Sequence, residues 1–175
     1  MSFTGFQYYL VLLDDFTHFV WTFPLRHKSE VAQHIIAFHA LIRTQFGSSI
    51  RAIQTDNGRE FDNSTLRRFY TENGIVIRLS CPYTSQQNGK AERVLRTLND
   101  GVRTLLLHAT LPPQFWVKAL QTSTYLHNRK PCNVYLDACA TQTQPPQALT
   151  NLPQDLWHVF LLATRRTIED IGATT

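Results

Sequence analysis

Residues Gln7–Leu25, QYYLVLLDDFTHFVWTFPL, decide the fold class of this chain. The first run, Gln7–Leu13, is continuously apolar and rich in β-forming residues, as expected of a strand that is covered on both faces. Asp14 and Asp15 interrupt that run with residues that favour a tight turn. The aromatic and β-branched run Thr17–Leu25 follows, so the stretch predicts an antiparallel β-hairpin near the start of the chain.

Beyond the hairpin, helical and extended patterns alternate along the chain. Apolar residues recur at helical spacing between Ser29, which can cap a helix, and Gly47, which can end one. Further elements are expected in this order: strand Ile50–Thr55, a short helix from Asn63 or Ser64 to Tyr70, strand Ile75–Leu79, a polar loop at Pro82–Gly89, a helix from Ala91 to about His108, and a helix from Gln114 to about Asn128. A hairpin that leads into alternating units is typical of a mixed α/β sheet flanked by helices.

The size and apolar content of the chain suit one domain with a single core. Its 175 residues are 43% hydrophobic and include eleven Phe, six Tyr and three Trp. The 17 basic residues outnumber the 13 acidic ones, which gives a net charge of +4 and a pI near 9.1. Most of the basic residues are Arg, whose guanidinium group forks onto phosphate oxygens. This balance favours a polyanionic partner such as DNA or RNA.

Cysteine use and hydropathy indicate an intracellular protein. The three cysteines are odd in number and form no CxxC pair, so neither a disulfide framework nor a cysteine-rich zinc site is indicated. The longest apolar run near the start, Tyr8–Leu13, is too short to span a bilayer, and no basic segment precedes it. We therefore expect no membrane association, and the sequence carries no recognisable targeting signal.

Two carboxylates in different predicted elements are the main chemical feature of the sequence. Asp56 ends a strand, Glu92 opens a helix, and thirty-five residues separate them. Magnesium in phosphodiester chemistry is held by a few carboxylates together with water and phosphate oxygens, so a converging pair of this kind suits a divalent cation. Spacing alone leaves a second reading open, with Asp56 as a turn residue and Glu92 as a first-turn carboxylate paired with Arg96.

The residues around both carboxylates resemble the catalytic core of copia-type LTR-retrotransposon integrases. Three blocks carry the resemblance in order and spacing: TDNGREF (55–61), PYTSQQNGKAERVLRTLND (82–100) and LPPQFWVKALQTSTYLHNRKP (111–131). The hairpin segment QYYLVLLDDFTHFVWTFPLRHKSE (7–30) resembles the part of the same family that follows its first catalytic strand. The resemblance therefore covers roughly residues 7–135, and it is highly specific.

The resemblance implies an RNase H-like α/β fold in an enzyme family that joins DNA ends. It implies dependence on Mg²⁺ or Mn²⁺ with a two-ion site, processing of the 3′ ends of element DNA, and strand transfer into target DNA. It assigns Asp56 and Glu92 to the second and third positions of the D,D-35-E triad, as catalytic and metal-binding residues. The implied partners are element ends and target DNA, with no small-molecule substrate; a homodimer could form, and the family suggests the nucleus.

The chain departs from the family at the first triad position. The first aspartate of the family lies on a strand upstream of the hairpin, whereas this sequence has MSFTGF (1–6) there, which contains no acid. We therefore expect an RNase H-like sheet with its first strand missing, as in an N-terminally truncated core. The two-ion site would then be incomplete and would not support strand transfer alone. Asp14 and Asp15 are expected to shape the hairpin and not to replace the missing acid.

Positive charge near Glu92 predicts contact with DNA phosphates. The resemblance implies that the positions four and seven beyond the glutamate, Arg96 and Asn99, meet element DNA. With nearby basic residues they form the predicted DNA-binding set: Lys90, Arg93, Arg96, Asn99 and Arg103. A solvated helix face with little affinity for DNA is the alternative.

A catalytic loop is expected immediately before Glu92. Its candidate residues are Gln86, Gln87, Asn88 and Gly89, and the glycine could let the loop move over a substrate. A plain surface connector is the alternative.

The resemblance ends near residue 135, which divides the chain into two expected parts. Residues 1–135 are expected to form a partial integrase catalytic core, and residues 136–175 a divergent tail. The segment TQTQPPQALTNLPQ (141–154) has the composition of a linker, and Leu156–Ile171 could form a short helix. For the whole chain we expect an integrase core that takes part in DNA integration by polynucleotidyl transfer and nucleic-acid binding. The alternative is a catalytically dead remnant that only binds nucleic acid or dimerises.

Overall fold

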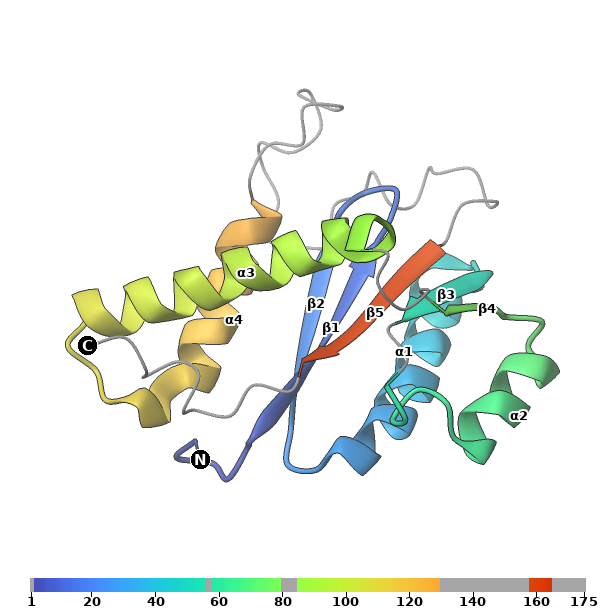
Figure 1. The fold of residues 1–175 in the computed structure, drawn as a ribbon, viewed down its shortest axis with the longest axis horizontal. Helices are drawn as coiled ribbons and strands as arrows, with labels where there is room; N and C mark the ends of the chain where they lie inside the picture. The colour runs from blue at the N-terminus through green and yellow to red at the C-terminus, as the bar shows by residue number, and fades with distance from the viewer. Residues whose placement is uncertain (1, 56–57, 80–84, 130–157, 165–175) are drawn as a thin grey trace.

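A mixed sheet with helices on both sides forms the framework of the molecule (Figure 1). The computed structural model describes residues 2–55, 58–79, 85–129 and 158–164. The strands are β1 (Tyr8–Asp14), β2 (Val20–Leu25), β3 (Ala52–Thr55), β4 (Val76–Leu79) and β5 (His158–Thr164). The helices are α1 (Val31–Phe46), α2 (Ser64–Glu72), α3 (Ser85–His108) and α4 (Trp116–Asn128), with short 3₁₀ turns η1 (Lys28–Glu30) and η2 (Pro113–Phe115). The predicted order of elements up to α4 is confirmed.

The sheet combines antiparallel and parallel pairing, and its strand order is β2-β1-β5-β3-β4. β1 and β2 form the predicted hairpin, in which Tyr8 pairs with Leu25 and Leu13 pairs with Val20. β5 is antiparallel to β1 and parallel to β3, and β3 is parallel to β4. The mixed α/β class expected from the sequence is therefore confirmed.

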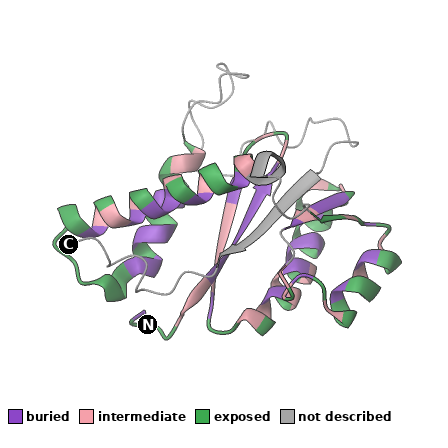
Figure 2. Cartoon of the chain, viewed as in Figure 1, coloured by how far each residue is buried: buried purple, intermediate pink, exposed green. Residues whose placement is uncertain are grey.

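β1 lies between two apolar cores, one on each face of the sheet. Leu10 and Leu12 pack in the cluster that contains residues of α1 and α2, whereas Tyr9, Val11 and Leu13 pack in the cluster formed with α3 and α4. All five side chains are at most 2% exposed, and Figure 2 shows this burial along the strand. Successive residues of a strand point to opposite faces, so a strand covered on both sides must be apolar throughout.

A segment from the C-terminal part of the chain completes the sheet. The hypothesis of a short helix over Leu156–Ile171 is wrong for His158–Thr164, which form β5 between β1 and β3. The sheet formed by the described residues has five strands, and none of them precedes β1 within residues 2–7. The run HVFLLAT is apolar and β-prone, which suits a strand with neighbours on both edges. The expected division at residue 135 lies outside the described residues and stays a prediction.

α3 begins earlier than the apolar pattern predicts. Its first residue is Ser85, whereas the predicted loop ran to Gly89 and the predicted helix began at Ala91. Gln and Lys are good helix formers, and a polar first turn carries no apolar periodicity that would reveal it. Neither α3 nor any other helix of the described residues is long and apolar enough to cross a membrane.

α3 and α4 approach each other closely at Gly101. A Cβ atom at this position would lie 2.2 Å from the Ser123 Oγ atom and 3.2 Å from the Ser123 Cβ atom. The Ser123 hydroxyl donates to the carbonyl oxygen of Leu98 at 3.2 Å and so links the two helices. The lack of a side chain at residue 101 therefore sets how near the two helices pack.

Substituting Gly101 by Ala should destabilise the fold by about 1–3 kcal/mol, because the new methyl group displaces the Ser123 hydroxyl. The double variant G101A/S123A should recover most of that loss, since alanine is favoured over glycine in a helix interior by up to about 1 kcal/mol. Chemical denaturation of both single variants and the double variant measures the coupling. Equal destabilisation by G101A with and without the Ser123 hydroxyl would contradict the contact.

Candidate functional site

The strand that leads to Asp56 is buried within the sheet. β3 ends at Thr55, which is 1% exposed and is the register partner of Leu161 in β5 and Leu79 in β4. Asp56 follows Thr55 directly in the sequence and lies outside the described residues. The predicted end of the strand at Thr55 is confirmed, whereas the position of the Asp56 carboxyl stays a prediction.

Glu92 lies on the exposed side of the first part of α3. Its neighbour Ala91 and the residue Leu95, one turn further on, are buried in the core between α3, α4 and the sheet. Glu92 is exposed, as the helical period requires for a residue beside that apolar stripe. Among the described residues no group of three Asp, Glu, His or Cys side chains could hold a metal ion. Convergence of Asp56 and Glu92 on one cation therefore stays a prediction.

The first acid of the hairpin, Asp14, is a turn residue. It is 1% exposed, and its Oδ2 atom accepts hydrogen bonds from the Thr17 backbone N–H at 2.7 Å and from the Thr17 hydroxyl at 2.5 Å. Its Oδ1 atom is buried without a hydrogen-bond partner in the described part of the chain. Burial raises the pKa of the Asp14 carboxyl, and the hydrogen bonds from Thr17 oppose that shift. These contacts support the expected role of Asp14 in shaping the hairpin.

The second acid, Asp15, ties the hairpin turn to α3. Its Oδ1 atom accepts a hydrogen bond from the Lys90 ammonium group at 2.7 Å, and both side chains are partly exposed. The two residues are 75 positions apart in the sequence, so no local pattern reveals this pair. The pair offsets one of the positive charges assigned to DNA contact and holds the first part of α3 beside the β1–β2 turn.

Two arginines of α3 present exposed positive charge. Arg93 and Arg96 are exposed, and neither forms an ion pair with any residue that the structure describes. The alternative reading, in which Glu92 pairs with Arg96, is therefore not what the structure has. Arg103 is half-buried, with its guanidinium 3.7 Å from the Asp100 carboxylate, so its charge is partly compensated.

Asn99 belongs to the interior and not to the exposed face of α3. Its side chain is 4% exposed, and its Oδ1 atom accepts a hydrogen bond of 2.7 Å from the Tyr9 hydroxyl. That bond satisfies a tyrosine hydroxyl whose ring is buried in the core on the α3 side. The predicted contact of Asn99 with DNA stays a prediction that its burial does not favour, because the helical period turns this residue inward beside Leu98.

The residues predicted as a catalytic loop lie in the first turns of α3. Gln86, Gln87, Asn88 and Gly89 are all helical, so the prediction of a loop is wrong at these positions. A Cβ atom at Gly89 would meet no other atom within 4 Å. A side chain at position 89 would therefore meet no neighbour that requires glycine there. The glycine that was expected to let a loop move lies in a regular helix instead.

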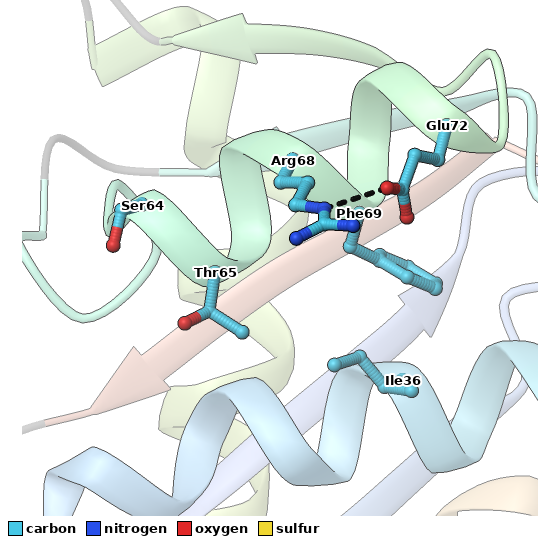
Figure 3. Close-up of a pocket in the computed structure, with 6 residues that line it drawn as sticks. All are labelled: Ile36, Ser64, Thr65, Arg68, Phe69 and Glu72. Carbon is cyan, nitrogen blue, oxygen red and sulfur yellow. Dashed lines mark hydrogen bonds and ion pairs between the residues drawn. The ribbon is translucent and has the colours of Figure 1, made fainter.

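An open cavity between α1 and α2 lies apart from the predicted site residues. It has a volume of about 530 Å³ and is lined by Ile36, Ser64, Thr65, Arg68, Phe69 and Glu72 (Figure 3). At its wall Arg68 and Glu72 form an ion pair of 2.6 Å. None of the lining residues belongs to the predicted catalytic or DNA-binding set.

The substitution Asp14→Asn tests the turn role of this acid. Burial raises the carboxyl pKa above its ordinary value of 3.8, so the contribution of Asp14 to stability is present at low pH and is lost as the pH rises through the folded-state pKa. The wild type should therefore lose stability relative to D14N as the pH rises from about 4 to 7. Urea unfolding at several pH values measures this difference. If the difference instead grew in favour of the wild type over this range, the carboxyl pKa of Asp14 would not be raised in the folded chain.

Sequence comparison relates this chain to retrotransposon polyproteins. The family model described as Integrase core domain matches residues 2–85. The Retrovirus-related Pol polyprotein from transposon TNT 1-94 of Nicotiana tabacum is 36% identical over 130 residues, which cover 74% of this chain and 10% of that polyprotein. The corresponding polyprotein from transposon RE2 of Arabidopsis thaliana is 36% identical over 131 residues, 75% of this chain and 9% of that polyprotein. The chain thus spans about a tenth of the length of the curated relatives it matches.

Solved structures with a similar fold are retroviral integrases. The HTLV-2 integrase catalytic core domain, in complex with magnesium and in a trimeric form, has a TM-score of 0.54 at 21% identity over 77% of this chain and 83% of that chain. The simian T-cell lymphotropic virus intasome, in complex with PP2A regulatory subunit B56 gamma, has a TM-score of 0.57 at 20% identity over 87% of this chain and 51% of that chain. At these identities the likeness shows the RNase H-like fold alone. The matching family model and the Pol polyprotein relatives show that the chain belongs to the integrase core family of retrotransposon Pol polyproteins.

Proposed function

We propose that this chain acts in DNA integration as a DNA-binding integrase core, with the exposed face of α3 as its contact to the DNA backbone. The observation that carries the proposal is the exposure of Arg93 and Arg96, one helical turn apart and beside Glu92, without acidic partners in the described part of the chain. Guanidinium groups bind phosphate oxygens bidentately. A positive helix face gains further affinity because bound phosphates release their counterions.

The other basic residues of the predicted set contribute less to this contact. The charge of Lys90 is offset by Asp15 at 2.7 Å, and Arg103 lies half-buried beside Asp100. Binding of a phosphate by Lys90 would require sharing or breaking its ion pair. Arg93 and Arg96 should therefore dominate the affinity for DNA.

Asp56 and Glu92 are the proposed ligands of Mg²⁺ or Mn²⁺. Such an ion, when bound, stabilises negative charge on the phosphate oxygens that are exchanged. The described residues contain no group of three metal-binding side chains, and two neighbouring cations need several anionic ligands to offset their repulsion. The two carboxylates named here, Asp56 and Glu92, would supply part of such a ligand set.

Element ends and target DNA are the partners that this proposal names. Integrase neighbours were solved in a trimeric form and as an intasome, so association of several copies, including a homodimer, is part of the proposal. Action on chromosomal DNA would place the chain in the nucleus. An active strand-transfer enzyme is the second candidate function, because this chain has acids at Asp56 and Glu92 that match two of the three positions of the family's triad.

The double substitution R93A/R96A should weaken binding to duplex DNA roughly tenfold or more at moderate salt, because two phosphate contacts are lost. The slope of log K against log salt concentration should also fall by about 2 in magnitude. Fluorescence anisotropy with a labelled duplex at several salt concentrations measures both quantities.

The matched control is R67A/R68A, which removes the same charge from α2. Arg67 pairs with Asp62 at 2.5 Å and Arg68 pairs with Glu72 at 2.6 Å, so both charges are already locally offset. Affinity for DNA should stay near the wild-type value in this variant. An equal loss in the two double variants would show that net charge alone drives binding and would remove α3 from the proposal.

Strand transfer by the 175-residue chain alone should not exceed that of D56N/E92Q, because the proposal names two carboxylates and the family's D,D-35-E triad has three. Joining of a processed element end to plasmid DNA, with Mg²⁺ or Mn²⁺ present, measures the activity on a gel. D56N/E92Q should bind DNA at least as well as the wild type, since loss of the negative charge of Glu92 beside Arg93 and Arg96 does not weaken their contact with phosphates. Joined product from the wild type and none from D56N/E92Q would favour the active enzyme instead.

A further inference from the structure

An ion pair joins the β1–β2 turn to the first part of α3. The Lys90 Nζ atom donates a hydrogen bond to the Asp15 Oδ1 atom at 2.7 Å, across 75 positions of the sequence, and Figure 1 shows the turn beside this end of α3. The Lys90 side chain is 57% exposed and the Asp15 side chain is 36% exposed. Water and salt screen a pair that is exposed to this extent, so the pair adds little to the stability of the fold.

Other contacts hold this part of α3 in place when the pair opens. Ala91 and Leu95 are buried and pack in the core between α3, α4 and the sheet. Further along the helix, the buried Asn99 accepts a hydrogen bond from the Tyr9 hydroxyl. Loss of the ion pair therefore changes the charge that Lys90 presents, while the helix keeps its position.

Lys90 continues the row of exposed cations on α3. It is three positions from Arg93, and Arg93 is three positions from Arg96, so each side chain is a neighbour of the next on the helix surface. All three residues are exposed. Within the part of the chain that the structure describes, Lys90 is the member of this row that forms an ion pair with an acid. The hairpin turn thus places a carboxylate against the first cation of the row.

A carboxylate in this place interferes with a phosphate at Lys90. The ammonium group has three donors, so a phosphate could reach it while Asp15 stays bound, but the two anions would then lie close to each other. Like charges at short separation repel, and the repulsion is strongest where little water lies between them. The more favourable arrangement has one anion at Lys90 at a time.

We propose that Asp15 is an internal competitor of DNA at α3: its carboxylate holds Lys90 in the free chain, and a backbone phosphate displaces it on binding. The inference rests on the proposed contact of α3 with DNA. A phosphate that is tethered to others held by Arg93 and Arg96 is present at a high effective concentration, which favours the exchange. A single small anion lacks that advantage, so the exchange selects an extended phosphate backbone.

The substitution Asp15→Asn tests the competition in the full chain. Asparagine keeps the size of the side chain and an oxygen that accepts from Lys90, so the charge is what changes. D15N should bind a labelled duplex about threefold to tenfold more tightly than the wild type, and the slope of log K against log salt concentration should rise by about 1 in magnitude. Fluorescence anisotropy at several salt concentrations measures both quantities. An unchanged or weaker affinity would overturn the proposal.

Asp62→Asn is the matched control. The Asp62 carboxylate pairs with Arg67 of α2 at 2.5 Å, and its side chain is 36% exposed, as that of Asp15 is. D62N therefore makes the same change in net charge and also releases a cation, but outside α3. Its affinity for DNA should rise far less than that of D15N. Equal gains in the two variants would overturn the proposal, because any released cation would then serve.

The gain in D15N must depend on Lys90. The double variant D15N/K90A should lose the gain, and K90A should cost more affinity in the D15N background than in the wild type, where Asp15 already offsets part of the charge. A gain that persists in D15N/K90A would overturn the proposal, since Asp15 would then act on the DNA directly.

Acetylation of lysines tests the exchange in the wild type, where no substitution can disturb folding. Duplex DNA should slow the modification of Lys90 about threefold or more relative to that of Lys118, which is exposed on α4. Inorganic phosphate at the same total phosphate concentration should not, because single anions gain nothing from tethering. Mass spectrometry of the acetylated peptides measures both rates. Equal effects of DNA on the two lysines, or equal protection of Lys90 by inorganic phosphate, would overturn the proposal.

The anisotropy measurements also separate this inference from the proposed function. Loss of affinity in R93A/R96A together with no gain in D15N would overturn the inference alone. A Lys90-dependent gain in D15N together with unaltered binding by R93A/R96A would instead overturn the role of the two arginines and support the competition at Lys90.

Discussion

Coverage of β1 on both faces and along both edges is the constraint on which the rest of the structure depends. Alternate residues of the strand enter two separate cores, so none of them can be polar without a partner. A strand buried in this way also cannot keep an open edge, because its backbone groups would lack both water and protein partners. The fold can therefore exist only if some segment fills the place between β1 and β3, and here residues His158–Thr164 fill it.

The same strand fixes how α3 presents its charges. Tyr9 donates its hydroxyl proton to Asn99, and Asp15, just after β1, accepts from Lys90. These two contacts anchor α3 at separate turns, through Asn99 on its buried side and through Lys90 on its exposed side. Because the apolar stripe of α3 packs against the sheet, Arg93 and Arg96 are exposed to solvent. Packing of α3 against β1 thus determines which basic side chains remain available to a polyanion.

Local patterns predicted the parts of the fold that depend on local physics. The hairpin and α1 follow from the period of their apolar residues. β5 was missed because a short apolar run can form a strand or a helix, and only pairing with β1 and β3 decides between them. The buried position of Asn99 was missed although a signal existed: Leu95, Leu98, Asn99 and Val102 follow the i, i+3, i+4, i+7 stripe of a buried helix face. The Lys90–Asp15 pair has no local signal.

Stability and metal chemistry pull in opposite directions at the centre of this sheet. An ionised carboxylate among buried strands is costly unless a cation or several donors compensate it. Asp14 illustrates the cost nearby, because burial raises its pKa even though Thr17 donates two hydrogen bonds to it. The central strand β5, HVFLLAT, carries neither Asp nor Glu, so its place in the sheet has no such cost.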